Sequence, residues 1–392
     1  MISYETHFKS KRPDGRFYSP LAAHMEMLRN ITPKLSVPHD LTKEEFFKWQ
    51  SAVKEKLREL LLLPEFTKQP SPKKLSSIKR DTYTVEKWEF YPDEYTAVPF
   101  LILIPDSASE KNPLPGVMCL PGSAHSKELL AGEPLLEHPV CRVVSYPERN
   151  AMAQYVVKNG MVAFAFDNPE TAESGLEMGG PCGKSRVQMC YGYIQSGLCY
   201  PGVSVFHKLC VMDFIKSLNY VDKDRLALSA HSLGTEAALY LALLCDDFKA
   251  LVFNDGLRDQ RYHYISITEQ DELTGMVQNI GNWHEVPGIM RWFGFPDLCA
   301  ALAPKYVAFN EGGGDCWFEK VRSTYRLFGA EDRVRVSHYP KYADENSRNC
   351  HGDAPKFGLS PEQYDEFNYI DAPDHSFREE PSISLLKDCF EL

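Results

Sequence analysis

From residue 116 onward, short apolar runs alternate with segments of helical periodicity, and this alternation restricts the fold more than any other feature of the sequence. The apolar runs lie at 116–120, 161–166, 225–229, 250–254, 306–310 and 334–339. The helical segments lie at 151–158, 203–218, 233–244, 317–328 and 382–390. Apolar strands separated by helices are typical of a mostly parallel sheet with helices on both faces. The sequence therefore predicts an α/β fold, in which functional groups gather at the carboxyl ends of the strands.

The first 80 residues differ from the rest, because they are rich in lysine and proline and contain one clear helical pattern. Thr42 and Glu45 form a capping box. Apolar residues then recur at helical spacing, at Phe46, Trp49, Val53, Leu57 and Leu60, until Pro64 ends the pattern. We expect residues 1–80 to form a helical extension that packs on a main domain at 81–392.

The main domain is expected to begin with an antiparallel pair of strands. Residues 83–90 alternate apolar and polar side chains, and residues 98–104 form an apolar run that can pair with them. Long segments near 168–200, 257–298 and 340–372 separate the later elements. Such segments at strand ends often form lids. We therefore expect lid insertions at these three places.

Charge and hydropathy exclude several classes of partner. The 392 residues include 43 Lys and Arg against 54 Asp and Glu, a formal net charge of −11. Proteins that bind nucleic acid usually carry clustered basic residues, so this excess of acidic residues argues against DNA or RNA as a partner. No apolar run approaches the roughly 18 residues of a membrane-spanning helix, and the N-terminal residues lack a signal-peptide pattern. We expect a cytoplasmic protein with no membrane partner, and the oligomeric state stays open.

The 11 cysteines are scattered along the chain and include no Cys-x-x-Cys pair. Zinc sites and disulfide scaffolds depend on such close spacing or on a small secreted chain. We therefore expect no metal site and no disulfide framework, and we interpret the cysteines as reduced thiols that pack like small apolar residues.

A serine stands between a predicted strand and a predicted helix. The strand at 225–229 is followed by Ala230-His231-Ser232-Leu233-Gly234, the Gly-x-Ser-x-Gly pattern with alanine in its first position. Such a turn needs small residues on both sides of the serine, because the strand and helix backbones nearly touch there, and it lifts the hydroxyl above the sheet. The pattern predicts that Ser232 is a nucleophile. The alternative is a serine that only caps an ordinary helix.

A serine nucleophile needs a histidine that accepts its proton and an acid that orients the histidine. His375 follows the last predicted strand and precedes the last helix, where it can reach back over the sheet to Ser232. His338, inside a strand, and His351, in a polar loop, are the competing candidates. We predict His375 to be the base.

The acid is expected after the strand at 306–310, in a glycine-rich turn. Asp315 is favoured, because a short carboxylate three residues past the first glycine fits the usual turn. Glu311 is closer to the strand and could instead brace the loop. Asp255, after the strand at 250–254, is a second alternative, although an Asp-Gly pair more often forms a turn.

The oxyanion of an acyl-transfer intermediate is usually bound by two backbone N–H groups. One should come from Leu233, the residue after the nucleophile. The other should come from the loop after 116–120, through Gly122 or Ser123. His125 in the same loop is interpreted as a loop residue.

With these residues in place, the chain resembles the alpha/beta hydrolases, and more narrowly the bacterial acetyl xylan esterase-like branch related to dienelactone hydrolases, with a long N-terminal extension. The resemblance runs from about residue 40 to the end. It is carried by 49–61, 122–128, 201–202, 220–225, 230–234, 295–298, 303–304, 311–315, 338–341 and 374–377. It implies an alpha/beta-hydrolase fold and Ser-His-Asp ester hydrolysis without metal or organic cofactor, often on acylated plant-polysaccharide sugars. Ala230 in place of glycine and Pro121 in place of histidine depart from the common pattern.

Aromatic residues gather in the expected insertions and could form a platform for sugar rings or aryl groups, or could simply pack a lid. They are Tyr191, Tyr193, Tyr200, Tyr262, Tyr264, Trp283, His284 and Trp292, with Trp317 close behind Asp315. Lys184, Arg258 and Arg261 could meet an acidic substrate group.

The predicted function is a serine carboxylesterase that acts on acetylated or otherwise acylated sugars, as small-molecule or oligosaccharide esters. The alternatives are a peptidase or lactonase that uses the same triad, and a non-catalytic binding protein on the same fold.

Overall fold

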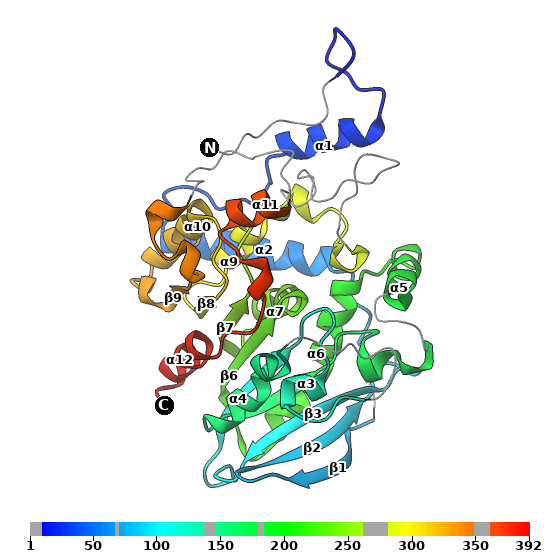
Figure 1. Ribbon diagram of the computed structural model, residues 1–392, viewed down its shortest axis with the longest axis vertical. Helices are drawn as coiled ribbons and strands as arrows, with labels where there is room; N and C mark the ends of the chain where they lie inside the picture. The colour runs from blue at the N-terminus through cyan, green and yellow to red at the C-terminus, as the bar shows by residue number, and fades with distance from the viewer. Residues whose placement is uncertain (1–9, 67–69, 137–145, 179–183, 262–280, 349–360) are drawn as a thin grey trace.

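The computed structural model describes residues 10–66, 70–136, 146–178, 184–261, 281–348 and 361–392. Within them, nine strands form one sheet in the order β1-β2-β3-β5-β4-β6-β7-β8-β9 (Figure 1). They are β1 (Lys73–Lys79), β2 (Tyr83–Phe90), β3 (Val98–Pro105), β4 (Leu114–Leu120), β5 (Val162–Phe166), β6 (Val221–His231), β7 (Phe248–Asn254), β8 (Tyr306–Phe309) and β9 (Val334–Val336).

The sheet has an antiparallel edge and a parallel remainder. The pairs β1/β2, β2/β3 and β3/β5 are antiparallel, and every pair from β5 to β9 is parallel. Both the antiparallel hairpin and the mostly parallel α/β sheet predicted from the sequence are confirmed. The carboxyl ends of β4, β6, β7 and β8 therefore meet along one edge.

Helices cover both faces of the sheet (Figure 1). The helices are α1 (Pro20–Asn30), α2 (Lys43–Leu60), α3 (Lys127–Ala131), α4 (Met152–Lys158), α5 (Lys184–Gln195), α6 (Tyr200–Ser217), α7 (Leu233–Leu244), α9 (Phe295–Ala300), α10 (Asp315–Arg326), α11 (Pro361–Asn368) and α12 (Glu379–Phe390). One core includes side chains from α3, α4 and α12, such as Leu130, Val156 and Leu386. The other includes side chains from α2, α6, α7, α9 and α10. Burial of these two apolar layers fixes the sheet and the loops at its edge.

The N-terminal segment contributes directly to the larger core. α2 begins with the predicted capping box, in which Thr42 Oγ1 accepts from the N–H of Glu45 and the Glu45 carboxylate accepts from the N–H of Thr42. Phe46, Val53 and Leu57 are fully buried in that core. The first strand, β1, lies before residue 80 and forms the outer edge of the sheet.

Among the described residues, no single helix is long and apolar enough to cross a membrane. Only α5 and α6 together, across a 92° bend, reach the length and apolar composition of a membrane-spanning segment. The eight cysteines among them are free thiols, and Cys119, Cys190, Cys199 and Cys299 are buried.

Candidate active site

Ser232 lies at a sharp turn between β6 and α7. β6 ends at His231, α7 begins at Leu233, and Ser232 has φ 51° and ψ −125°, which non-glycine residues rarely adopt. A Cβ at Gly234 would lie 2.5 Å from the carbonyl oxygen of Leu120, so only glycine fits where α7 passes the end of β4. The predicted strand–turn–helix geometry around the serine is therefore present.

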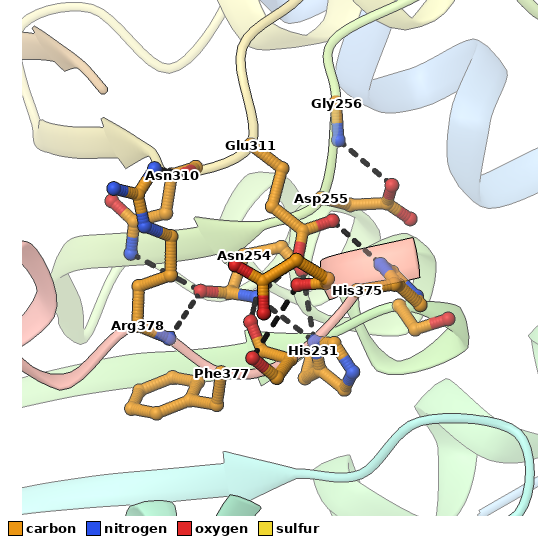
Figure 2. Close-up of polar contacts among 12 residues, drawn as sticks. His231, Asn254, Asp255, Gly256, Asn310, Glu311, His375, Phe377 and Arg378 are labelled. Atoms are coloured by element: carbon orange, nitrogen blue, oxygen red, sulfur yellow. Dashed lines mark hydrogen bonds and ion pairs between the residues drawn. The ribbon is translucent and has the colours of Figure 1, made fainter. Parts of the chain in front are cut away.

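His375 lies in the loop before α12 and is paired with a carboxylate. Its Nδ1 is 2.6 Å from Glu311 Oε2 (Figure 2). The Glu311 side chain is fully buried, whereas 35% of the His375 side chain is exposed. The ring centroid of His375 is 4.6 Å from that of His231, the residue before Ser232. The imidazole therefore lies beside the turn that carries the serine.

The hydrogen bonds of His375 within the described residues do not include one to Ser232. In ligand-free sites this contact is often long and tightens only when substrate binds. The arrangement therefore places a hydrogen-bonded carboxylate–imidazole pair beside the strained turn of Ser232.

The carboxylate bonded to His375 is that of Glu311, whereas Asp315, the acid favoured from the sequence, is paired with Arg348. Asp315 is the first residue of α10, and its Oδ1 lies 2.8 Å from Arg348 Nη1. Glu311, which the sequence interpretation placed second as a loop brace, occupies the position at the end of β8 that the acid was expected to fill.

The glycine turn explains this difference. Gly312 and Gly313 have φ of 74° and 141°, so the chain reverses immediately after Glu311. The N–H of Gly312 donates to the carbonyl of Ser337, and its carbonyl accepts from the N–H of Leu257. These bonds fix the turn between neighbouring strand ends, and the residues beyond it lead into α10.

The other alternative acid, Asp255, forms the local turn that its Asp-Gly sequence suggested. Its Oδ1 accepts from the N–H of Gly256 at 2.7 Å. Its negative charge nevertheless reaches the site, because it contributes to raising the pKa of His375.

The loop expected to bind the oxyanion contacts the serine directly. A Cβ at Gly122 would lie 3.4 Å from the Cβ of Ser232 and 3.1 Å from the His231 ring. Leu233 provides the first backbone N–H of α7, at the other side of the serine. Gly122 and Leu233 therefore lie on two sides of the Ser232 turn.

Two side chains that the sequence interpretation did not identify hold this loop in place. Asn168 Nδ2 donates to the carbonyls of Pro121 and Gly122 at 2.9 and 3.0 Å. Arg186 Nη2 donates to the carbonyl of Ser123 at 2.6 Å. In a trans peptide the carbonyl and the following N–H point in opposite directions, so these bonds turn the N–H of Ser123 away from Asn168.

A buried charge cluster fixes the helix that follows this loop. Lys127 Nζ lies 2.8 Å from Glu128, 2.9 Å from Asp167 and 2.6 Å from Glu173, and the lysine side chain has no exposed surface. Burial alone would lower the pKa of Lys127, but the three carboxylates outweigh it and raise that pKa. The lysine is therefore charged and ties α3 to the end of β5.

A cavity of about 620 Å³ opens at Ser232. Its floor is α7, and residues 284–291 form one side. Side chains of α1 complete the lining, so the N-terminal segment takes part in the site. This volume is in the range of small-molecule binding sites.

Comparison with known proteins agrees with this geometry. Residues 3–388 match the model of the Abhydrolase family. The chain is an alpha/beta hydrolase. No curated protein sequence matches it.

Solved structures of similar shape include several ester hydrolases. This hydrolase is 31% identical to a Bacteroides fragilis protein named as a "putative acetyl xylan esterase", with 97% of each chain covered and a TM-score of 0.89. A methylesterase is 16% identical, with 97% of this chain and 74% of the other covered and a TM-score of 0.56. A family 15 glucuronoyl esterase from Teredinibacter turnerae is 14% identical, with 99% and 96% covered and a TM-score of 0.50. The last two show the shared fold alone.

Asn254, at the end of β7, connects the parts of this hydrolase site (Figure 2). Its Nδ2 lies 3.1 Å from Glu311 Oε1, 2.9 Å from His231 Nδ1 and 3.1 Å from the carbonyl of Ser376. Its Oδ1 accepts from the N–H of Arg378 at 2.9 Å, which fixes which end of the amide donates. The sequence interpretation missed Asn254, although a polar residue at a strand end was the available signal.

The electrostatics of the hydrolase site favour an imidazolium at 375 and a neutral imidazole at 231. Burial would lower the pKa of His375, but the charge and hydrogen bond of Glu311 outweigh it and raise that pKa to about 9. Burial, with the neighbouring His375 and His125, holds the pKa of His231 well below its ordinary value. Burial raises the pKa of Glu311, and the attraction of His375 opposes this.

Three side chains of the site could also hold a metal ion. The ligand atoms of His231, Glu311 and His375 lie within 4.8 Å of one another. Two histidines and a carboxylate suit zinc or another transition ion. The two oxygens of Glu311, however, are already bonded to Asn254 Nδ2 and to His375 Nδ1. The hydrogen-bonded pair and a bound metal are therefore competing uses of this group.

The remaining predicted residues lie around the site or outside the described residues. His338 packs against Phe318 and Tyr369, and burial together with Arg348 lowers its pKa to about 4. His125 stacks on His231 with centroids 5.2 Å apart. Arg258 lines the cavity, whereas Arg261 pairs with Asp259 at 2.8 Å. Tyr262, Tyr264, His351 and the side chain of Lys184 lie outside the described residues.

The predicted aromatic platform is dispersed. Trp283 lies in a small cluster with Tyr193, Tyr200 and Leu233. Trp317 packs edge to face on Phe367. Trp292 lies under the ammonium groups of Lys34 and Lys56. Trp283 is therefore the tryptophan of this set that packs against the cluster containing Leu233, the residue after Ser232.

Proposed function

We propose that the protein is a serine carboxylic-ester hydrolase that removes acyl groups from sugars or related small molecules, with Ser232 as nucleophile, His375 as base and Glu311 as the orienting acid. The observation that carries this proposal is the 2.6 Å pair of His375 and Glu311 beside the strained turn of Ser232. A serine hydroxyl becomes nucleophilic only when such a pair removes its proton.

In the proposed reaction, Ser232 Oγ attacks the ester carbonyl while His375 Nε2 accepts its proton. The imidazolium then gives that proton to the departing alcohol, and the acyl group stays on the serine. A water molecule that loses its proton to His375 next attacks the acyl group. The acid is released as the imidazolium returns that proton to Ser232 Oγ, which restores the starting state. Glu311 keeps the proton on Nδ1, so that Nε2 is free to act, and it stabilises the imidazolium.

Negative charge on the carbonyl oxygen would be stabilised by backbone N–H groups of Leu233 and of the loop at Gly122 and Ser123. Donors of this kind lower the barrier because they are already oriented when the charge develops. The hydrogen bonds from Asn168 and Arg186 to the same loop supply that orientation.

The name of the Bacteroides fragilis protein supports a sugar ester as the substrate class, because that chain is 31% identical over nearly its full length. The cavity supports the same class. An acetyl group fills only a small part of about 620 Å³, so the rest can take a bulky alcohol such as a sugar.

The test is hydrolysis of 4-nitrophenyl acetate by the purified protein and by Ser232→Ala. We expect Ser232→Ala to lower kcat by about 10⁴-fold or more, as removal of a nucleophile does in other serine hydrolases. Ser196→Ala, at an exposed serine after α5, is the matched control and should keep the rate. A fluorophosphonate should label Ser232, located by peptide mapping.

Activity that survives in Ser232→Ala would refute the nucleophile and with it this mechanism. A panel of acetyl, feruloyl and methyl-glucuronate esters would then identify the acyl group, by comparison of kcat/KM across the panel.

A further inference from the structure

The cavity contains a second glutamate–histidine pair, distinct from the pair at Glu311. Glu236 Oε1 lies 2.6 Å from His284 Nδ1, and both residues line the cavity that opens at Ser232. Glu236 lies in the first turn of α7, which begins directly after Ser232, and both residues line the same cavity. The proposed reaction does not use this pair.

The two oxygens of Glu236 differ in their surroundings. Oε1 is bonded to His284, whereas Oε2 is buried and has no hydrogen-bond partner among the described residues. A buried carboxylate oxygen without a donor is costly, because it has lost its water and gained nothing in return. Its position in the cavity lining means that a bound ligand can supply the missing donor.

The charge of the pair indicates what kind of donor fits. Burial would lower the pKa of His284, but the charge and hydrogen bond of Glu236 outweigh it and raise that pKa. Oε1 of the carboxylate is already engaged by His284, so Oε2 is the atom left to accept a hydrogen bond. A hydroxyl group can donate that single bond without bringing a further charge into the cavity.

The lining next to His284 includes apolar side chains among its charged ones, which suits a ring that carries hydroxyl groups on its edge. Val286, Pro287 and Ile289 line the same side of the cavity as His284. A polar point on an apolar wall is how binding sites fix the orientation of a small ligand.

We propose that Glu236, held by His284, is a specificity-determining residue that accepts a hydrogen bond from a hydroxyl group on the alcohol part of the ester. This inference rests on the proposed esterase function and adds which esters are preferred. Esters of polyhydroxylated rings are favoured over esters of apolar rings of the same size, because only the former supply the donor that Glu236 Oε2 lacks.

The test compares a monoacetylated methyl xyloside with cyclohexyl acetate, which has a six-membered ring without hydroxyl groups. The quantity measured is the ratio of kcat/KM for the two esters. We expect Glu236→Gln to lower this ratio about tenfold, because a hydrogen bond to a charged acceptor becomes a weaker neutral one. The loss should appear mainly in KM for the xyloside, since the contact is made before and during the reaction.

The matched control is Glu55→Gln, which removes the same charge from an exposed glutamate of α2 that does not line the cavity. We expect it to change the ratio less than twofold. A ratio that is unchanged in Glu236→Gln, or that falls equally in both variants, would overturn the inference and leave the esterase function standing. A wild-type protein that hydrolyses neither ester would refute both.

A second measurement needs no variant of Glu236. Methyl xyloside and cyclohexanol are compared for their ability to slow fluorophosphonate labelling of Ser232 in the wild-type protein. We expect protection by the xyloside at concentrations at least fivefold lower. Equal protection by the two would contradict a role for the hydroxyl groups.

Discussion

Two glutamate–histidine pairs lie close to the turn that carries Ser232, and they differ in what surrounds the carboxylate. Both have 2.6 Å between the carboxylate oxygen and Nδ1. Glu311 is fully buried and its second oxygen accepts from Asn254, whereas the second oxygen of Glu236 has no partner among the described residues. A carboxylate with hydrogen bonds at both oxygens has a fixed orientation. A carboxylate with a hydrogen bond at only one oxygen can still accept one from a ligand. The comparison assigns orientation of the base to the first pair and recognition to the second.

Among changes to the two pairs, the largest expected effect comes from breaking the first. Glu311→Gln should lower kcat for 4-nitrophenyl acetate by about 10³- to 10⁴-fold, because an amide in place of the orienting acid stabilises the wrong tautomer of the base. Steady-state kinetics on the purified variant measures this.

Asp315→Asn is the control, since it removes the carboxylate that the sequence favoured and that the structure pairs with Arg348. It should stay within about threefold of the wild type, as a substitution at a partly exposed ion pair usually has a small effect. A severe loss in Asp315→Asn with a nearly normal Glu311→Gln would reverse the assignment.

The sequence was enough to predict the sheet and the serine turn, because each depends on local patterns. Apolar runs and helical spacing identify the elements, and the small residues around Ser232 identify the turn. The place of His375 before the last helix predicted that it lies near this turn, as the structure has it, and its role as the base stays a prediction. These features can be predicted without knowledge of the contacts between residues far apart in the sequence.

The acid could not be chosen from the sequence in the same way. Glu311 and Asp315 lie in one loop, and the direction of that loop depends on Gly312 and Gly313 and on bonds to Ser337 and Leu257. Asp315 is turned to Arg348, a partner far along the chain. Glu236 and His284 are likewise brought together by tertiary packing. Pairings of this kind follow from the fold and not from spacing.

A second prediction concerns the pH dependence of the first pair. The base works only when neutral, so kcat/KM should rise with pH until His375 has lost its proton, and its raised pKa puts the midpoint near 9. In Glu311→Gln the raising influence of the carboxylate is gone and burial remains, so the midpoint should fall below the ordinary 6.5. A pH–rate profile of both proteins tests this, and identical midpoints would show that Glu311 does not act on the base.

A third prediction tests the contact that distinguishes the two pairs. Asn254→Ala leaves Glu311 Oε1 without its donor and so makes the first pair resemble the second. We expect kcat to fall about tenfold and the free energy of unfolding to fall by about 1–3 kcal/mol, because a buried acceptor loses its hydrogen bond. Thermal or urea unfolding measures the stability and steady-state kinetics the rate. A variant with normal kcat would mean that the Asn254 contact is not needed to orient the acid.

The smallest expected effect is that of metal removal, and it separates two uses of one group of atoms. His231, Glu311 and His375 could bind a transition ion, yet a base that acts through Nε2 needs the bond between its Nδ1 and Glu311 to stay intact. Dialysis against a chelator at fixed pH should therefore change kcat by less than about 1.2-fold, the ordinary scatter of such assays, because no step of the proposed reaction passes through a metal. A large loss of activity that added zinc restores would instead show that Glu311 and His375 bind a metal ion. The two pairs would then differ because Glu311 binds a metal and Glu236 does not.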